Sequence, residues 1–298
     1  MSAAADSLPA TGFASRLPAD VYHALGGVSI SRLKEMLRSP RHYRYRLANP
    51  KTSAPMLLGT AAHCATLEPE RFGREFVTWS RRSENGNLCP RKGQYWDAFV
   101  LENGGRTIIT EDEMELARAI ASAVRTDQLA MRYLESGEPE VTMRWKLGIE
   151  DAEVAGATID CRGRADWITY IEGKPVVVGL KTARDCRPFP FGAAAYKLGY
   201  HLQWAFYFDG FVALTGKEPA MKEIVVESDA PHDVAVYDIP QDVIEQGRAD
   251  YQALLRTLAQ CENENHWPGI AGGHELTFTL PTYAYEKMED VGDLGLEV

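Results

Sequence analysis

Two neighbouring segments carry acidic and basic residues at a spacing that suits chemistry on phosphate. The segment GRADWITYI is followed by the turn EGKP and then by VVVGLK. In an antiparallel hairpin that pairs Ile171 with Val176, Asp166 faces Lys181, and position 179 projects from the same face as a diagonal neighbour. Carboxylates on such a face hold Mg²⁺, and a lysine supports the nucleophile and the developing charge. This arrangement predicts metal-dependent phosphodiester hydrolysis.

Two helical segments carry further side chains of this kind. GTAAH places His63 one helical turn after Gly59, and in QWAFY the residues Gln203 and Tyr207 share a helix face because they are four positions apart. A single helical histidine is more often a structural residue than a ligand, and an aromatic helix more often belongs to a core. Asp and Lys at strand ends are also common on solvated surfaces. Each feature by itself therefore predicts little about function.

A basic segment near the beginning of the chain reverses the charge of the whole. The chain has 32 Lys and Arg against 42 Asp and Glu, a net charge of −10. That balance argues against a protein that coats nucleic acid through its entire surface. Between residues 31 and 51, however, a single acid, Glu35, accompanies Arg32, Lys34, Arg38, Arg41, Arg44, Arg46 and Lys51. The segment predicts either a solvated helical face or a surface that contacts DNA phosphates through Arg41 and Arg44.

Composition bounds the class of protein. Of 298 residues, 45% are hydrophobic and 25% are charged, which is typical of a soluble globular protein. No run of 18 apolar residues predicts a membrane span, and the first residues lack the pattern of a secretory signal, so we expect a cytoplasmic protein. The odd number of widely spaced cysteines predicts reduced thiols rather than a disulfide framework or a CxxC metal site: Cys64, Cys89, Cys161, Cys186 and Cys261.

The order of elements predicts one α/β domain. We expect residues 1–28 to form a loose leader in which Val21 to Leu25 dock, residues 29–268 the domain, and residues 269–298 a C-terminal extension. Helices are expected at 29–39, 42–47, 56–68, 110–124, 191–214 and 240–261, and a mobile loop at 81–96. Thr110 followed by Glu113 predicts a capping box. Residues 140–181 read as a strand meander, and KEIVVE and DVAVYDI add strands.

The order of these motifs resembles a known superfamily. GxxxH, GRAD, a strand ending in xLK, and QxxxY resemble the motif series of the PD-(D/E)XK nucleases in their RecB-like branch. With the flanking SISRLKEMLRSPRHYRY, RKGQYWDAF, EVTMRWK and WPGI, the chain looks like the RecE-type (exodeoxyribonuclease VIII-like) phage exonucleases from Ser29 to Trp267. The resemblance implies a PD-(D/E)XK core, with a central mixed β-sheet flanked by helices and an N-terminal helical portion.

The same resemblance implies an activity and a set of site residues. His63 and Asp166 would ligate Mg²⁺, with Mn²⁺ able to substitute, Glu140 would be an additional acid, and the Leu180 backbone carbonyl would contact the ion. Lys181 would be the catalytic lysine, and Gln203 and Tyr207 would orient substrate or lysine. The family digests linear double-stranded DNA from the 5′ end and leaves a 3′ single strand for a RecT-type annealing protein. It usually does so as a ring-shaped homo-oligomer, a trimer or tetramer.

One position departs from the family pattern. Where the pattern has D-L-K, this chain has Gly179-Leu180-Lys181, and glycine offers no carboxylate. Three explanations are open: a substitution that silences a toxic nuclease, a natural pseudonuclease, or transfer of the ligand's role to Glu140 or another acid. We favour the first, since glycine is unfavourable within a β-branched strand. It predicts that Gly179→Asp creates activity with little effect on folding. The rival function is a non-catalytic DNA-binding or assembly subunit.

Other functional classes lack their motifs. VVVGLKT is not a phosphate-binding loop, because GxxxxGK[ST] requires glycine immediately before the lysine and Leu180 stands there. The chain contains no GxSxG, HExxH or GxGxxG. Some RecB-like nucleases hold an iron–sulfur cluster on one early and three late cysteines. Cys261 is the one late cysteine, so we expect no such cluster.

Overall fold

A mixed β-sheet forms the centre of the computed structural model, which describes residues 10–50, 54–149 and 158–280. The strand order is β1-β5-β6-β7-β8-β9, and the short β2 pairs with β6. β7 and β8 run parallel, as do β2 and β6, and the other neighbours are antiparallel. The strands are β1 (Gly12–Ser15), β2 (Val28–Ser29), β5 (Glu138–Gly148), β6 (Thr158–Ile171), β7 (Lys174–Ala183), β8 (Ala220–Glu227) and β9 (Val234–Asp238).

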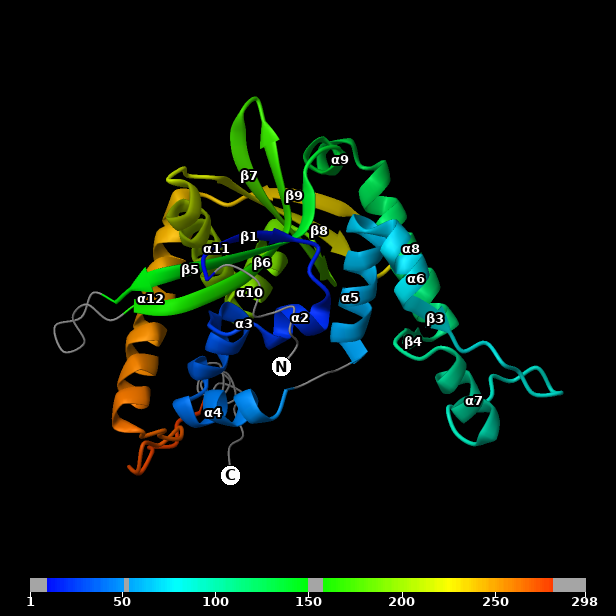
Figure 1. The fold of residues 1–298 in the computed structure, drawn as a ribbon, viewed down its shortest axis with the longest axis horizontal. Coiled ribbons are helices and arrows are strands. Elements are labelled where there is room, and N and C mark those ends of the chain that lie inside the picture. Colours follow the sequence, from blue (N-terminus) through cyan, green and yellow to red (C-terminus); the bar gives the residue numbers. More distant parts are fainter. Residues whose placement is uncertain (1–9, 51–53, 150–157, 281–298) are drawn as a thin grey trace, which may run out of the picture.

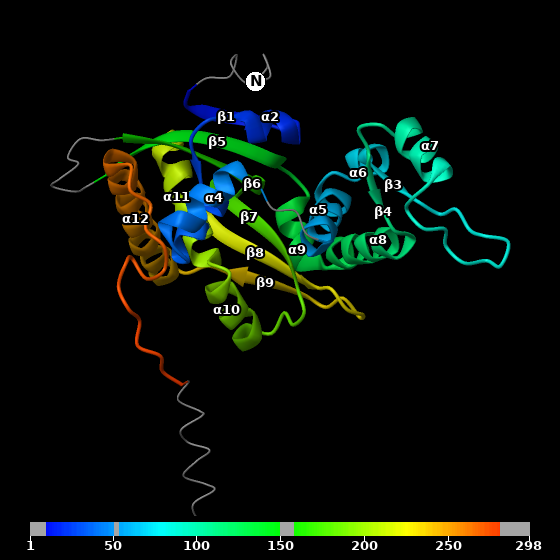
Figure 2. The ribbon, with the colours of Figure 1, turned by 90° about the horizontal axis from the view of Figure 1, so that it is seen from below.

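Helices cover both faces of this sheet, as the sequence predicted (Figures 1 and 2). One face carries α3, α11 and α12, and the other carries α5, α8 and α9. The helices are α2 (Ala19–Ala24), α3 (Ile30–Leu33), η1 (Lys34–Leu37), α4 (Pro40–Ala48), α5 (Ala54–Leu67), α6 (Pro69–Glu75), α7 (Gln94–Glu102), α8 (Glu111–Thr126), α9 (Gln128–Leu134), α10 (Pro188–Lys197), α11 (Tyr200–Thr215) and α12 (Gln241–Glu264). No helix among the described residues is long and apolar enough to cross a membrane.

The strand β7 is apolar on both faces because helices lie on both sides of it. Val176 and Val178 pack with residues of α5 and α8, whereas Val177 packs in the cluster that contains α11. Successive side chains of a strand point to opposite faces. Position 179 and Lys181 therefore lie on the face of Val177, the one that α11 covers.

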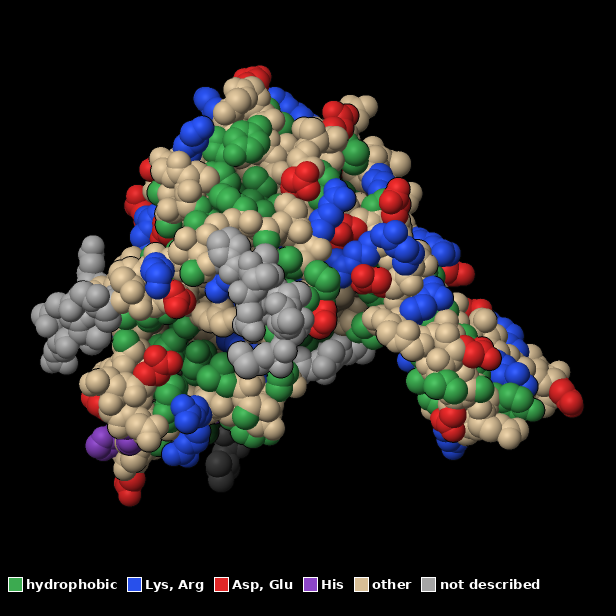
Figure 3. Space-filling model, in the orientation of Figure 1, with side chains coloured by type: hydrophobic (Ala, Val, Ile, Leu, Met, Phe, Trp, Pro, Cys, Tyr) green, Lys and Arg blue, Asp and Glu red, His purple; other side chains and the backbone are tan. Residues whose placement is uncertain are grey.

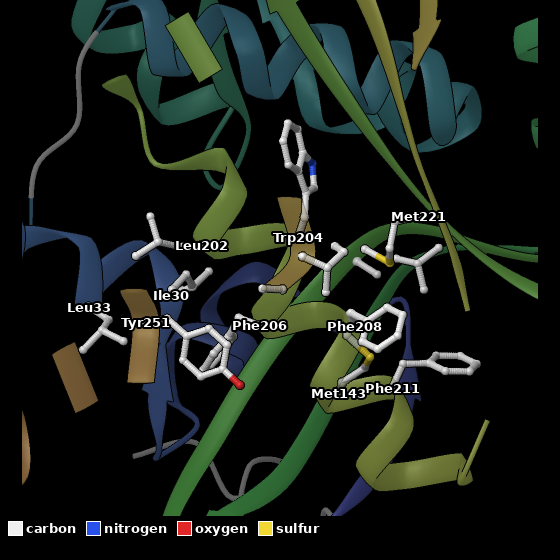
Figure 4. Packing of buried hydrophobic residues seen from close by; sticks show 14 of the residues in the cluster. Ile30, Leu33, Met143, Leu202, Trp204, Phe206, Phe208, Phe211, Met221 and Tyr251 are labelled. Carbon is white, nitrogen blue, oxygen red and sulfur yellow. The ribbon is translucent and has the colours of Figure 1, made fainter. Parts of the chain in front are cut away.

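The larger hydrophobic cluster lies between the sheet and α11. Leu202, Phe206 and Phe211 of α11 are buried with Met143 of β5, and the Trp204 ring extends beyond them at one end of the group (Figure 4). A fully buried aromatic or aliphatic side chain contributes about 1.5–3 kcal/mol through removal of its surface from water. This cluster holds α11 in a fixed position against the strands that carry the acidic residues.

The leader expected at residues 1–28 is ordered where the structure describes it. β1 pairs with β5, and α2 follows it. The buried guanidinium of Arg162 donates hydrogen bonds to the carbonyl oxygens of Tyr22 and Leu25 at the end of α2. Val21 and Leu25 are buried, which agrees with the expected docking of this segment. Pairing of β1 with β5 had no signal in an Ala- and Pro-rich sequence.

The helix α5, which carries His63, is held by α8. The capping box predicted at α8 is present: Thr110 accepts from the Glu113 N–H, and Glu113 accepts from the Thr110 N–H. Near the other end of α8, Arg125 donates to the carbonyl oxygens of Ala65 and Thr66 in the last turn of α5. A cation at a helix C-terminus satisfies carbonyl groups that lack partners within the helix.

Two predicted elements differ in detail, and one pair of strands was not predicted. The single helix expected at 191–214 is two helices, α10 and α11, because Gly199 between them adopts a left-handed conformation with φ 65°. The loop expected at 81–96 contains a bridge between Arg82 and Leu88 and leads into α7. β3 (Phe76–Thr78) and β4 (Thr107–Ile109) form a separate parallel pair beside α7. This part of the chain extends from the body of the molecule (Figures 1 and 2).

Candidate metal centre

The hairpin of β6 and β7 has a tighter turn than predicted. Ile171 pairs with Lys174 rather than with Val176, so the turn has two central residues, Glu172 and Gly173, with φ of 51° and 78°. Positive φ at both central residues is typical of two-residue hairpins, whose twist matches that of the strands. The EGKP prediction placed Pro175 in the turn, but it lies in β7, opposite Tyr170.

This register corrects the predicted partner of Asp166. The last pair before the acid is Trp167 with Val178, and one further step places Asp166 level with Gly179 rather than with Lys181. The shift is two residues, and strand side chains alternate with period two. Asp166, Gly179 and Lys181 therefore remain on one face, as predicted.

The acidic residues form one row across four adjacent strands. The pairs Pro139–Trp167 and Val141–Ala165 bracket Glu140 and place it level with Asp166. On the other side, Gly179 pairs with Glu223 of β8. The row thus reads Glu140, Asp166, Gly179, Glu223, from β5 to β8. Glu223 was not among the predicted site residues, although an acid beside the apolar run IVV of β8 is a recognisable signal.

Three side chains of the site come close enough to share one ion. His63 of α5, Glu140 and Asp166 each offer a ligand atom, and these atoms lie within 4.8 Å of one another. His63 Nδ1 is 3.8 Å from Asp166 Oδ1. Burial lowers the pKa of His63 despite the nearby Asp166, so the imidazole is neutral and its lone pair is available to an ion. Two carboxylates and one imidazole are ligands that Mg²⁺ and Mn²⁺ accept, so these residues fit the expected ion.

The pKa of the Glu140 carboxyl group is well above its ordinary value. Burial raises its pKa to about 7, although Arg164 opposes the shift, with its Nε 2.8 Å from Glu140 Oε2. The charge of Asp166 adds to the rise. Glu140 also has a positive φ, 51°, within β5. A buried acid that is partly protonated near neutral pH is typical of a site that binds a cation.

Backbone and side chain together fix Asp166. Burial by itself would raise the pKa of Asp166, but Lys181 and His63 outweigh it and the pKa is lowered. The Leu180 N–H donates to Asp166 Oδ2 at 2.9 Å, and the Leu180 carbonyl accepts from Lys181 Nζ at 3.2 Å. The Leu180 carbonyl therefore lies beside Lys181, and its contact with an ion stays a prediction.

Lys181 lies between two carboxylates. Its Nζ is 3.3 Å from Asp166 Oδ2 and 3.4 Å from Glu223 Oε1. Burial would lower the pKa of Lys181, but these two acids more than offset it and the pKa is raised. The ammonium group is therefore permanently charged. It cannot accept a proton and is suited instead to stabilising negative charge.

Gln203 and Tyr207 line the same pocket as the three ligand residues. The pocket has a volume of about 400 Å³ and is also lined by Tyr22 of α2 and by Arg164. The Tyr207 ring packs on Gly163, where an added β-carbon would lie only 2.6 Å from a ring carbon. Glycine in GRAD thus leaves room for the tyrosine. The structure brings together both residues of QxxxY, and their role in orienting substrate stays a prediction.

Arg41 and Arg44 lie away from this pocket. Both belong to α4 and are exposed. The Arg41 N–H donates to the Pro268 carbonyl at 3.0 Å, and the Arg44 guanidinium lies over the Trp267 ring at 4.9 Å. They therefore contact the segment that follows α12, and the structure does not bring them to the metal ligands.

A second pocket adjoins the first and contains further arginines. It has a volume of about 540 Å³, shares Glu68 and Arg71 with the first pocket, and adds Arg16 and Arg74. Figure 3 shows Lys and Arg side chains among acidic ones over α6 and α8, to the right of the centre. The approach to the ligand residues is thus a charged surface rather than an apolar one.

The space around position 179 explains why glycine stands there. Its φ is not positive, so the backbone does not require glycine. A β-carbon added at Gly179 would lie 2.5 Å from Oε1 of Glu223 and would also clash with Oε2. Glu223 is buried, with 1% of its surface exposed, and the Trp204 indole N–H donates to it, so it has little room to move. Gly179→Asp therefore requires the Glu223 carboxylate to shift, and its small effect on folding stays a prediction.

Comparisons with known proteins agree with this fold. A family model described as a PDDEXK-like domain of unknown function (DUF3799) matches residues 29–278. A crystal structure described as that of a "Putative exonuclease" from Eubacterium rectale is similar with a TM-score of 0.58 and 13% identity, over 91% of this chain and 98% of that one. At this identity the likeness shows the fold alone.

Two further solved structures are less similar. SSO0001 gives a TM-score of 0.38 at 16% identity, over 79% of this chain and 76% of that chain. VC1899 from Vibrio cholerae gives 0.21 at 14% identity, over 79% of this chain and 57% of that one. No curated protein matches the chain.

Proposed function

Since the chain belongs to the family of PDDEXK-like domains of unknown function (DUF3799), within the PD-(D/E)XK nuclease superfamily, we propose that it is a metal-dependent deoxyribonuclease. The observation that carries this proposal is the convergence of His63, Glu140 and Asp166 beside the charged Lys181. Carboxylates, an imidazole and a lysine that converge in this way are suited to metal-dependent phosphodiester hydrolysis.

The residues divide the work of the reaction between them. His63, Glu140 and Asp166 would hold a divalent ion, Mg²⁺ or Mn²⁺. When bound, the ion supplies Lewis-acid polarisation of the phosphate and lowers the pKa of water. The Lys181 ammonium stabilises the charge that develops on the phosphate. Because Lys181 lies beside Asp166, it would be close to the phosphate oxygen atoms that the ion polarises. Gln203 and Tyr207 orient the substrate from α11.

Linear double-stranded DNA is the substrate that we propose. The resemblance of the sequence to RecE-type enzymes supports an exonuclease, and the similar structure from Eubacterium rectale is itself described as one. The same sequence resemblance supports digestion from 5′ to 3′, a recombination role beside a RecT-type annealing protein, and a ring-shaped homo-oligomer.

A degradation assay tests this function. End-labelled linear duplex and a covalently closed circle are incubated with the chain and Mg²⁺ or Mn²⁺, with EDTA in parallel. We expect metal-dependent loss of the linear duplex alone, and we expect Lys181→Met to abolish it. Degradation of the circle would refute the exonuclease. DNA binding without cleavage by the parent chain would favour the pseudonuclease, which Gly179 had suggested.

A further inference from the structure

The chain has a carboxylate at the place that Gly179 leaves open. We propose that Glu223 of β8 supplies to the metal site the carboxylate that position 179 lacks, so that the metal-binding acid has moved sideways by one strand. This inference rests on the proposed metal-dependent function and deepens it, because it assigns a further ligand to the same site. It replaces the explanation that Gly179 silences the enzyme.

The strand register places Gly179 and Glu223 side by side. Gly179 and Glu223 are paired residues of neighbouring parallel strands, so their side chains point to the same face. Neighbouring strands lie about 4.8 Å apart, and a glutamate is longer than an aspartate by one methylene group. A glutamate on β8 can therefore bring its carboxylate over the backbone of β7, provided that β7 has no side chain there.

The Glu223 carboxylate lies directly beside the backbone of Gly179. A β-carbon at 179 would meet both carboxylate oxygens and the carboxyl carbon of Glu223, the carbon at 2.7 Å. The Glu223 carboxylate thus fills the space in which a side chain of residue 179 would stand. Glycine at 179 and glutamate at 223 are two parts of one arrangement, and either one alone would leave a gap or a clash.

The two carboxylate oxygens of Glu223 have different surroundings. Its Oε2 accepts the Trp204 N–H, whereas Oε1 is buried without a hydrogen-bond partner among the described residues and lies 3.4 Å from Lys181 Nζ. A buried carboxylate oxygen without a hydrogen bond is unfavourable unless a cation compensates it. Lys181 Nζ contacts both Asp166 and Glu223, so the two carboxylates share one ammonium group, although Glu223 lies outside the group formed by His63, Glu140 and Asp166.

The sequence order of the motif is thereby altered, while the spatial set is retained. Asp166, a second carboxylate, the Leu180 carbonyl and Lys181 remain together, but the second carboxylate comes from β8 rather than from β7. Carboxylate oxygens are the preferred ligands of Mg²⁺ and Mn²⁺, so Glu223 adds a donor of the required type beside Asp166.

An exchange of the two residues tests the proposal. The parent, Glu223→Gly, Gly179→Asp and the double variant Gly179→Asp/Glu223→Gly are titrated with Mn²⁺ by calorimetry, with the melting temperature recorded for each. We expect Glu223→Gly to weaken Mn²⁺ binding by on the order of tenfold or more. The double variant should recover most of that loss, because it returns a carboxylate to β7 and removes the clash.

Two further variants make the test specific. Gly179→Asn/Glu223→Gly has the shape of the exchanged pair without its charge and should not recover Mn²⁺ binding. Glu223→Gln keeps an oxygen for the Trp204 N–H and should fold like the parent while it binds Mn²⁺ weakly. Glu227→Gln, on the same strand, removes a carboxylate outside the row and should bind Mn²⁺ like the parent.

The outcomes separate this inference from the proposed function. If Glu223→Gln and Glu223→Gly bind Mn²⁺ within twofold of the parent, Glu223 is not a ligand, and a loss of cleavage alone would then show that it merely positions Lys181. In that case the nuclease function stands. If the Mn²⁺ exchange succeeds while the parent cleaves no DNA, the assignment of Glu223 stands and the nuclease function is refuted.

Discussion

The raised pKa of Glu140 predicts a specific dependence of stability on pH. The Glu140 side chain is 13% exposed, and its pKa rises from the ordinary 4.5 to about 7 in the folded chain. The folded state therefore binds this proton more tightly than the unfolded state does. Stability contributed by the protonated group is lost as the pH rises from 4.5 through 7, and the full cost applies above pH 7.

The magnitude follows from the size of the shift. One pKa unit corresponds to about 1.4 kcal/mol, so relative to low pH the metal-free folded state loses about 3 kcal/mol of stability at pH 8, where Glu140 is ionised. At pH 5 it loses about 1 kcal/mol, because Glu140 is then still protonated in the folded state but is ionised in most unfolded chains. Glutamine resembles the protonated acid in shape and does not titrate. We therefore expect Glu140→Gln to be more stable than the parent by about 3 kcal/mol at pH 8 and by about 1 kcal/mol at pH 5.

Urea unfolding in EDTA at the two pH values measures this difference. Glu138→Gln is the matched control, since Glu138 lies on the same strand with a side chain that is 57% exposed, and it should show no such change. Addition of Mn²⁺ at pH 8 should reverse the order, because the parent gains more from the ion than the variant does. An advantage of Glu140→Gln that is the same at pH 5 and pH 8 would refute the reasoning.

Three further predictions concern other parts of the site. Asp166→Asn should lose the rise in melting temperature that Mn²⁺ gives the parent, and a retained rise would place the ion elsewhere. Gly163→Ala should lower the free energy of unfolding by about 1–3 kcal/mol in urea, because its methyl group meets the Tyr207 ring, and Tyr207→Leu in the same chain should relieve this cost. Reversal of Arg41 and Arg44 to Glu should flatten the salt dependence of duplex binding by about one log–log unit per lost phosphate contact. An unchanged slope would assign them to packing against the segment after α12.

The fold was predictable where local patterns and burial agree. The alternation of short apolar segments predicted the strand meander at 140–181, and the capping box predicted the beginning of α8; both are present. The hairpin register was mispredicted because EGKP permits two turns, and proline at an edge of the turn does not decide between them. Face assignment survived, since an error of two residues preserves the alternation of side chains.

The candidate site was predictable only as far as motifs run along the chain. Asp166 and Lys181 were found because they belong to one hairpin, and His63 was found through the order of the motifs. Glu223 was not found, because its relation to Gly179 is a pairing between strands that α10 and α11 separate in sequence. The ordered residues 12–24 were missed for a similar reason, since β1 gains its stability from pairing with β5.

The pairing of Gly179 with Glu223 has a consequence for how this sequence can change over generations. A chain that first acquires an acid at 179 crowds two carboxylates into one space, and a chain that first loses Glu223 leaves Lys181 with one acid fewer. Each of these two single substitutions is therefore unfavourable, whereas the exchange of both residues together avoids both costs. Among homologous chains we therefore expect an acid at one of the two positions and a small or apolar residue at the other.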